Sequence, residues 1–481
     1  MMWPSLALLL AAQAAPTPPP PDIKDLLESV RKVMSVYAAL SDEAADPVDP
    51  TPAIYGGVLP GMLRGLDPHS VFLDPDQMQQ LKEMNSSERK GFGSVVSILP
   101  GRVFVLQTLP GTPSAKSGLS PGDEIVAVNN ISLMGLEPEQ LIQLLSETRR
   151  REAQIYVRRL NTPRLLSFQL VPENLAAPSV DRAFMLPAGP GYIRIANFDQ
   201  KTGQEFKAAI EKLGGASLPG LVLDLRNNPG GAVETALEAC SLFLKPGTKL
   251  LSIRGRSKKE EDVHAPDGGT PYEFPVTVLI NEKTASAAEI LGSALKDHKR
   301  AILLGNRSFG KGLVQSVYSL SGGSGIALTV AYYYSPSGNN LQRPLKNVQI
   351  ETPDSPGGIA PDETVLPDAG NRLRAVLDMS GSFTAFATEL VRKGTPKDPL
   401  PTGVYDDFRI WLSERQIQPS VSDWSANGEW LRSRMQQEVL NLTQGVEKGD
   451  EVELARDPVV RRAVERLKPP APPPPAKPAN N

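Results

Sequence analysis

Hydrophobic residues recur at helical spacing at both ends of the chain. In residues 23–40 the apolar side chains fall three or four positions apart, which is typical of an amphipathic helix. Residues 54–84 show shorter helical stretches, interrupted by a turn at LDPHS (66–70). Beyond residue 370 the chain becomes charged and again helical, with helices expected at 383–393, 405–418, 426–445 and 457–467. Helical segments are therefore predicted to flank a central region of different character.

The centre of the chain changes first to short strands and then to strand–helix repeats. From Gly91, two apolar strands precede a turn-rich segment, a helix at 137–147 and the strand AQIYVRRL. Between 191 and 365, buried apolar runs alternate with helices expected at 202–214, 232–244 and 284–297. Such alternation is typical of layered α/β architectures. The predicted fold class is a multidomain α+β protein with an α/β core.

The first residues have the pattern of an export signal. Residues 5–12 (SLALLLAA) are apolar, and Ala12-Gln13-Ala14 fits the small-residue rule for cleavage after Ala14. The apolar run is far shorter than the roughly 20 residues of a membrane span. Because MMWPS contains no Lys or Arg, a mis-assigned start or a short uncleaved membrane anchor stays as the alternative. We expect a periplasmic or secreted protein.

Composition narrows the classes of function. The 481 residues include 51 Lys and Arg against 54 Asp and Glu, and this near-balance gives no support for a general nucleic-acid binder. The single cysteine, Cys240, excludes an intramolecular disulfide and a Cys-rich metal site, and its apolar helix face predicts a buried residue. The three histidines lie far apart, which argues against a His-built metal centre. No metal or other cofactor is predicted.

The histidines are each given a non-catalytic interpretation. His69 lies in the LDPHS turn and is expected to be structural. His264 is expected in a polar, mobile loop, and His298 at the C-terminus of a helix, facing water, where a cation is favoured. A Ser-His-Asp triad is not excluded by counting residues, but no Gly-x-Ser-x-Gly elbow surrounds the candidate serine described below.

One central segment resembles a PDZ domain. Gly91-Phe92-Gly93-Ser94 precedes an apolar strand, and GTPSAKSGLSPGDEIVAVNN follows about 20 residues later. In PDZ domains the Gly-x-Gly backbone binds a ligand's terminal carboxylate, and the ligand adds as a strand beside a helix. The resemblance assigns the other groove wall to the helix from Pro138 to Leu145, whose apolar residues are Leu141, Ile142, Leu144 and Leu145. Ser94 stands where the loop usually has an apolar residue, and the alternative is a small β-domain with a glycine turn.

A candidate nucleophile follows a buried strand at Thr284-Ala285-Ser286-Ala287-Ala288-Glu289. A serine at a strand-to-helix turn exposes its hydroxyl, and the next backbone N–H groups can stabilise an oxyanion. However, Ser286-x-x-Glu289 is also a helix capping box, and on these residues alone the cap is the favoured interpretation.

A candidate base lies about 25 residues later in Ser308-Phe309-Gly310-Lys311-Gly312. A strand is predicted from Lys311, which would place Lys311 and Gln315 on one face. A lysine can accept a serine's proton when burial lowers its pKa, and Gln315 could hold the amine in place. For a lone lysine, a solvated surface position is the ordinary alternative.

A third motif, Asp224-Leu225-Arg226-Asn227-Asn228-Pro229-Gly230-Gly231, ends another buried strand. The N–H of Gly230 or Gly231 could supply a second oxyanion donor beside that of Ala287. Asp224 and Arg226 lie on one strand face and are expected to form a structural pair. Alone, the motif predicts only a helix-capping turn.

Together these motifs closely resemble those of the carboxyl-terminal processing peptidases, tail-specific serine proteases with a Ser-Lys dyad. The match covers residues 23–365 in family order, through GYIRIANF, LVLDLRNNPGG, LINEKTASAAEI, NRSFGKGLVQ, SPSG and GIAPDETV. It implies Ser286 as nucleophile, Lys311 as general base and Gln315 as the residue orienting the lysine. It implies oxyanion N–H groups from Ala287 and from Gly230 or Gly231, supported by Asp224, Arg226 and Glu289. The family's core is an α/β spiral related to crotonases.

The chain departs from the family at two places. Alanines flank Ser286 where many members have serines, and 343–357 looks like a longer loop before GIAPDE. Pattern and resemblance divide the chain into a signal peptide (1–14), a Pro-rich linker (15–22), an N-terminal helical segment (23–85), a PDZ domain (86–172), a protease core (173–368), a C-terminal helical region (369–467) and a disordered Pro-rich tail (468–481).

The leading hypothesis is a periplasmic or secreted endopeptidase that binds the C-terminal tails of envelope proteins through its PDZ domain and cleaves them. An inactive PDZ scaffold or chaperone is the alternative from another class, and a third hypothesis is a zymogen blocked by its PDZ domain until a tail or adaptor binds. The expected partners are protein tails, with an adaptor or regulator and homo-oligomers left open. Nucleic acid is not expected as a partner, nor is a membrane except through an uncleaved N-terminal segment.

Overall fold

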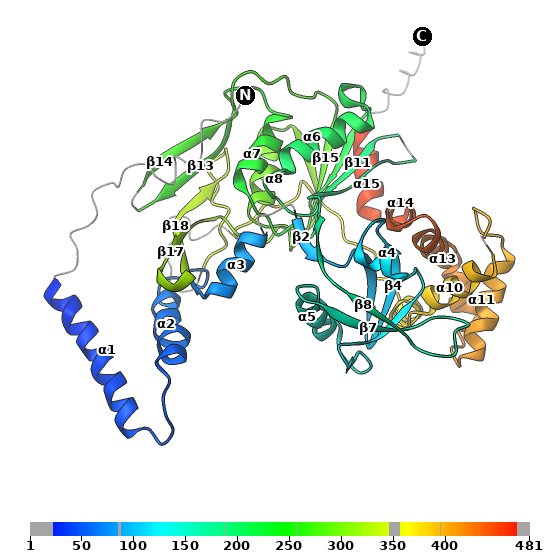
Figure 1. The fold of residues 1–481 in the computed structure, drawn as a ribbon. Coiled ribbons are helices and arrows are strands. Elements are labelled where there is room, and N and C mark those ends of the chain that lie inside the picture. The colour runs from blue at the N-terminus through cyan, green and yellow to red at the C-terminus, as the bar shows by residue number, and fades with distance from the viewer. Residues whose placement is uncertain are drawn as a thin grey trace, which may run out of the picture. The chain divides into compact units, whose positions relative to one another are not determined.

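The computed structural model describes residues 23–84, 88–187, 189–256, 258–345, 356–394 and 396–468. The predicted signal peptide, the Pro-rich linker, most of the 343–357 loop and the tail beyond Lys468 lie outside these residues. The chain divides into two compact units (Figure 1). The first comprises residues up to 86, 179–181 and 193–364, and the second 87–178, 182–192 and the residues from 365 onward.

The first unit contains most of a six-stranded sheet, of which residues 182–192 in the first two strands are grouped with the second unit. Its strands, in spatial order, are β10 (Val180–Met185), β11 (Gly191–Ile195), β12 (Leu221–Asp224), β15 (Val276–Ile280), β16 (Ala301–Gly305) and β19 (Glu363–Thr364). Strands β12, β15, β16 and β19 are parallel. Every residue of β12 and β15 is buried, which agrees with their unbroken apolar sequence. The carboxyl ends of parallel strands share one edge, so the loops after β12, β15 and β16 come together there.

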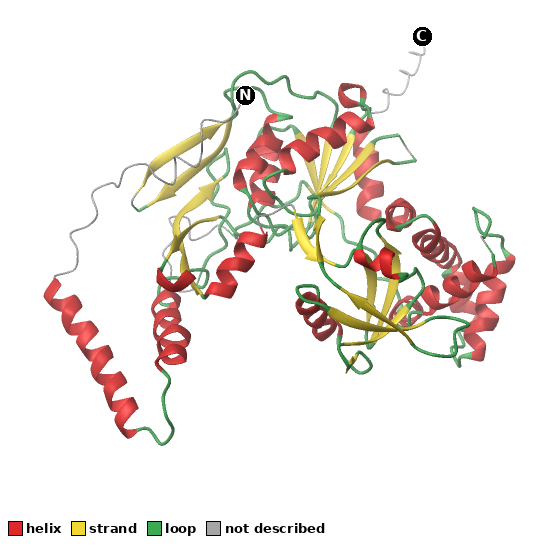
Figure 2. Ribbon diagram, viewed as in Figure 1, coloured by secondary structure: helices red, strands yellow, loops and turns green. Residues whose placement is uncertain are grey.

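Helices connect the strands of this sheet, as the alternating pattern predicts (Figure 2). They are α6 (Thr202–Leu213), η3 (Gly215–Ser217), α7 (Val233–Ser241) and α8 (Ala287–Asp297). Cys240 is buried in α7 as a free thiol, as expected. His298 caps the C-terminus of α8 and is exposed, also as expected.

A second sheet in this unit contains a hairpin that the sequence did not predict. Its strands are β1 (Val71–Leu73), β18 (Gly325–Tyr334), β13 (Lys249–Gly255) and β14 (Lys258–His264), with β17 (Leu313–Ser319) also paired to β18. The expected loop around His264 is therefore wrong, because His264 ends β14 and is paired with Lys249. A run of consecutive charged residues, from Lys258 to Asp262, hid this strand, since its sequence lacks the apolar face of a half-buried strand.

The N-terminal helical segment forms α1 (Ile23–Glu43), the π-helix η2 (Pro52–Val58), α2 (Leu59–Arg64) and α3 (Pro75–Met84), and a short η4 (Ser321–Gly323) links β17 to β18. Although α1 is amphipathic as predicted, none of its residues is buried. Within the described residues no helix combines the length and apolar character needed to cross a bilayer.

The second unit joins a small β-domain to the C-terminal helices. The β-domain has the strand order β3 (Ser94–Leu99), β4 (Arg102–Thr108), β5 (Glu124–Val128), β7 (Ala153–Arg158) and β8 (Leu166–Leu170), with β6 (Ile131–Ser132) beside β5. A separate pair joins β2 (Glu88–Gly91) to β9 (Glu173–Ala176), and the helices are α4 (Pro113–Ser117) and α5 (Pro138–Thr148).

The C-terminal region folds into seven helices within its described residues: α9 (Arg372–Met379), α10 (Ser382–Lys393), α11 (Gly403–Glu414), α12 (Val421–Ala426), α13 (Gly428–Thr443), α14 (Val446–Arg456) and α15 (Pro458–Leu467). The helix expected at 426–445 begins two residues later, at Gly428, and α9, α12 and α14 were not predicted. Gly449 lets α14 approach α13, because a Cβ there would lie 1.9 Å from the Asn441 side chain. Aromatic residues of α10 and α11, including Phe383, Phe386 and Phe408, fill the core between the helices.

The helices cover one face of the β-domain within this unit. The Asp123 carboxylate is fully buried between two arginines, Arg159 at 2.6 Å and Arg392 of α10 at 3.5 Å. Arg102 of β4 donates to the Ser380 carbonyl at 2.9 Å. Gly122 packs against Thr388, where a Cβ would lie only 2.6 Å from a methyl carbon. The predicted C-terminal helical region is therefore structurally continuous with the β-domain.

Candidate active site

Ser286 lies in the loop between β15 and α8, at the N-cap position of α8. Its backbone has φ 55° and ψ −121°, a conformation that costs a non-glycine residue about 1–3 kcal/mol. An ordinary N-cap has extended backbone, so capping alone does not account for this geometry. The Glu289 carboxylate accepts the Ser286 N–H at 2.8 Å, which is one half of the capping box. The capping and nucleophile interpretations therefore apply to the same serine.

Glu289 connects the nucleophile loop to the lysine loop. Its buried carboxylate accepts from Ser308 Oγ at 2.5 Å and Gly310 N at 2.7 Å through Oε1, and from Lys311 N at 2.9 Å and Ser286 N through Oε2. Burial raises the pKa of Glu289, and these hydrogen bonds offset that effect only in part. Because all four partners are donors, the arrangement fits the ionised carboxylate. The backbone N–H groups of Ser286 and Lys311 thus donate to the same carboxylate oxygen, Oε2 of Glu289.

Lys311 precedes β17 rather than starting it, since that strand begins at Leu313. Its side chain is partly buried, and no ion pair joins it to any residue of the described part. Burial lowers the pKa of Lys311, because the charged ammonium loses hydration there. The solvated-surface alternative is therefore not what the structure shows, and the amine has the environment that a general base requires.

Gln315 contacts the LDPHS turn. Its Nε2 donates to the His69 carbonyl at 2.8 Å, and no hydrogen bond to the Lys311 amine is formed. The pairing of β17 with β18 shifts register between Val314 and Gln315, so strict alternation from residue 311 does not hold. The contact between His69 and Gln315 was missed from the sequence, because 246 residues separate them and neither motif points to the other.

The loop after β12 packs directly against Ser286. Gly230 has φ 95°, and a Cβ at this position would lie 2.7 Å from the Ser286 Cβ and 3.0 Å from the Ala287 nitrogen. The Gly230 N–H already donates to Asn228 Oδ1 at 2.8 Å. Gly231 is exposed, and its N–H has no acceptor among the described residues. Of the two predicted glycines, Gly231 thus has the free donor beside that of Ala287.

Asn228 is a site residue that sequence reasoning missed. Its carbonyl accepts the Ala285 N–H at 2.9 Å, and its buried side chain donates to the Ile195 carbonyl at 2.7 Å. Asn228 therefore fixes the glycine loop to both β11 and the nucleophile loop. The only sequence signal was an asparagine directly before Pro-Gly-Gly, which by itself predicts a turn.

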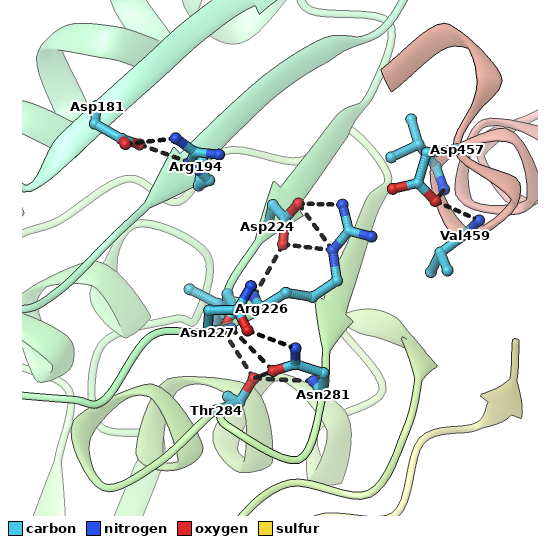
Figure 3. A network of polar contacts seen from close by, with 11 residues as sticks. Asp181, Arg194, Asp224, Arg226, Asn227, Asn281, Thr284, Asp457 and Val459 are labelled. Atoms are coloured by element: carbon cyan, nitrogen blue, oxygen red, sulfur yellow. Dashed lines mark hydrogen bonds and ion pairs between the residues drawn. The ribbon is translucent and has the colours of Figure 1, made fainter. Parts of the chain in front are cut away.

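A second set of polar contacts ties the loops after β12 and β15 (Figure 3). Arg226 forms a bidentate pair with the buried Asp224, with Nη2 to Oδ2 at 2.6 Å. Asn227 N donates to Asn281 Oδ1 at 2.9 Å, and Thr284 Oγ1 donates to the Leu225 carbonyl at 2.8 Å. The expected pair of Asp224 and Arg226 forms at the start of the loop that leads to Gly230.

The predicted tail-binding residues belong to the second unit. Gly93 has φ 78°, and Gly91 to Ser94 lead into β3, which is an edge strand of its sheet. The fully buried Leu141 packs in the β-domain core, so it is not part of an open groove wall. Leu145 and Phe92 are only partly buried against that core. Among the expected wall residues of α5, Ile142 is exposed.

Family models and relatives agree on the class of protein. The model described as Peptidase family S41 matches residues 189–365, and that described as PDZ domain matches residues 79–158. A carboxyl-terminal-processing protease of Synechocystis is 30% identical over 311 residues, which cover 63% of this chain and 69% of that protein. The chain belongs to the carboxyl-terminal processing proteases.

Members of this processing protease family are serine-type hydrolases. The carboxy-terminal-processing protease of Bartonella bacilliformis is 33% identical, and the aligned part spans 59% of this chain and 65% of that relative. Among solved structures, the photosystem II D1 C-terminal processing protease matches with 30% identity and a TM-score of 0.40, over 70% of this chain and 86% of that one. The S41 match contains every residue of the candidate active site except the LDPHS turn.

Proposed function

We propose that this protein is a serine endopeptidase in which Ser286 is the nucleophile and Lys311 the general base. The observation that best supports the proposal is the shared Glu289 carboxylate, which binds the backbone N–H groups of both residues. The strained backbone of Ser286 and the lowered pKa of the Lys311 amine add to it. Both features are typical of catalytic groups.

In the proposed reaction the neutral Lys311 amine accepts the Ser286 hydroxyl proton as Oγ attacks the peptide carbonyl. The N–H groups of Ala287 and Gly231 donate to the oxyanion. The ammonium then passes its proton to the leaving amine, and an acyl-enzyme on Ser286 remains. Water deprotonated by Lys311 hydrolyses that ester and regenerates the hydroxyl. The Glu289 carboxylate holds the serine and lysine loops together, and Gln315 ties β17 to the LDPHS turn.

We assign substrate selection to the PDZ domain. The edge strand β3 beside α5 can accept a peptide as an added strand, with the terminal carboxylate at the Gly91–Ser94 backbone. The proposed substrates are C-terminal tails of envelope proteins, reached after export through the N-terminal signal. For the core, we propose the crotonase-related spiral arrangement; its parallel strands with intervening helices are compatible with it.

The test compares tail cleavage by the purified protein and by four variants. Ser286→Ala and Lys311→Ala are expected to lose cleavage, because each removes one partner of the proton transfer. Ser316→Ala in β17 and the exposed Lys283→Ala are matched controls that should cleave as the unchanged protein does. Cleavage by the Ser286→Ala variant would refute the assignment of Ser286 as the nucleophile.

The natural substrates are sought by mass spectrometry of envelope-protein C-termini in cells that carry either the unchanged protein or Ser286→Ala. Tails that persist only in the variant strain are the expected result. Tail binding without cleavage by the unchanged protein would instead support the scaffold function. Cleavage that starts only after a second tail peptide is added would support the PDZ-blocked zymogen.

A further inference from the structure

The LDPHS turn is fastened to the strands that follow Lys311. Asp67 accepts the N–H groups of His69 at 2.7 Å and Ser70 at 2.8 Å, and the Ser70 hydroxyl at 2.6 Å. Ser70 Oγ in turn accepts the Thr329 N–H of β18 at 3.1 Å. Because β1 directly after the turn pairs with β18, the position of His69 is set by strand pairing. The turn is therefore a rigid part of the first unit.

His69 interacts with both Gln315 and Lys311, the residue proposed as the general base. Its carbonyl accepts Gln315 Nε2 at 2.8 Å. Its half-buried imidazole is within electrostatic range of the Lys311 ammonium, and burial together with that charge holds the pKa of His69 below its ordinary value. A neutral ring within that range adds no negative charge that would stabilise the ammonium, so it is compatible with the neutral lysine that the proposed reaction requires.

We propose that His69 is a positioning residue of the dyad, which fixes Gln315 through its carbonyl and shields the Lys311 amine with its ring. This inference rests on the proposed function, because it concerns the group assigned as the base. His69 does not exchange the reacting proton. Instead, it influences the protonation state and the position of Lys311, which accepts that proton.

Other titratable groups lie in the segments that contact His69 or Lys311. Asp67 lies in the same turn, where burial raises its pKa but hydrogen bonds from Ser70 and His69 outweigh that effect, so it stays ionised. Tyr332 of β18 has a raised pKa through burial and the Asp67 charge, so it stays neutral. Glu289 of α8 holds the Lys311 backbone. These groups are the same in all variants compared below, so differences arise at position 69.

The experiment measures the protonation of Lys311 directly, in a Ser286→Ala background that cannot cleave. Acetic anhydride acylates only neutral amines, and mass spectrometry gives the extent of labelling at Lys311 against pH, with exposed Lys283 as internal reference. Three changes are compared: His69→Phe keeps a neutral ring, His69→Ala admits water, and His69→Asp adds an opposite charge. His264→Asp, at the exposed histidine of β14, is the matched control.

We expect the half-labelling pH of Lys311 to be unchanged in His69→Phe and His264→Asp. It should rise by at least about one pH unit in His69→Asp and by less in His69→Ala. In proteins with Ser286 intact, the rising limb of kcat/KM with pH should move in parallel. Circular dichroism checks folding, and if the aspartate variant does not fold, the alanine variant decides the direction.

An unchanged labelling curve in folded His69→Asp or His69→Ala overturns the inference, as does total loss of cleavage in folded His69→Phe, since His69 would then act in proton transfer itself. The two hypotheses fail separately. Absence of cleavage in the unchanged protein with a shifted labelling curve refutes the proposed function alone. Normal cleavage with an unshifted curve refutes only the role of His69.

Discussion

At the scale of single residues, the site depends on one carboxylate with four donors. Glu289 was expected as a cap or a supporting residue, and it holds both loops that carry the proposed dyad. Such a fully used acceptor is sensitive to loss of one oxygen, because a buried donor without a partner costs about 1–3 kcal/mol.

Glu289→Gln tests this dependence. The amide nitrogen would face two of the four donors, so the free energy of unfolding should fall by about 2–3 kcal/mol. Displacement of the loops should lower kcat/KM by roughly 100-fold. Denaturant unfolding and tail-cleavage kinetics measure the two effects. Glu282→Gln, at an exposed position in the loop that precedes α8, should change neither quantity. A fully active Glu289→Gln would contradict the role given to the carboxylate.

The lowered pKa of Lys311 predicts the direction of the pH profile. Burial disfavours the ammonium, so the neutral amine becomes populated at lower pH than the ordinary lysine value of about 10.4. The kcat/KM for a tail peptide should therefore rise with pH, with the midpoint of the rise below that value. A rising limb at or above the ordinary lysine pKa would contradict Lys311 as a buried base.

At the scale of elements, the sequence indicated most strands and helices but not their fine geometry. The apolar runs at 221–224 and 276–280 are buried strands because both faces are covered, and this leaves a clear signal. The start of β17, its register shift at Gln315 and the positive φ of Ser286 depend on pairing and packing with distant segments. No local pattern encodes them.

One helix end gives a measurable case. Asp457 caps α15 by accepting the N–H groups of Val459 at 2.8 Å and Val460 at 3.3 Å (Figure 3). Asp457→Ala should lower the free energy of unfolding by about 1 kcal/mol. Asp407→Ala, at an exposed position in the middle of α11, should have an effect near zero. If denaturant unfolding gave the same change in free energy for both variants, the Asp457 cap would contribute no stability to α15.

At the scale of the whole molecule, the C-terminal helices belong with the PDZ domain in one compact unit. The sequence suggested a separate helical region, because no pattern links Asp123 to Arg392 across 269 residues. The candidate site could be assembled from motifs, since its residues flank parallel strands. The contact between the C-terminal helices and the β-domain could not be predicted from motifs, since it depends on which helix face packs against which strand.

Arg392→Met tests whether the surface is maintained by that arginine. The change removes the ion pair to buried Asp123 and a hydrogen bond to the Leu160 carbonyl. We expect the free energy of unfolding to fall by about 1–2 kcal/mol and amide hydrogen exchange to become faster in both β5 and α10. The neighbouring exposed Lys393→Met is the control. Faster exchange confined to α10 would mean that the two parts are not coupled there.

The arrangement of the two units along the chain orders events during synthesis. The segments that build the candidate site end at residue 364, whereas the helices that cover Asp123 come afterwards. At about 5–20 residues per second, a ribosome needs on the order of ten seconds to make that last part. A nascent chain can therefore assemble Ser286 and Lys311 before its tail-binding unit is finished.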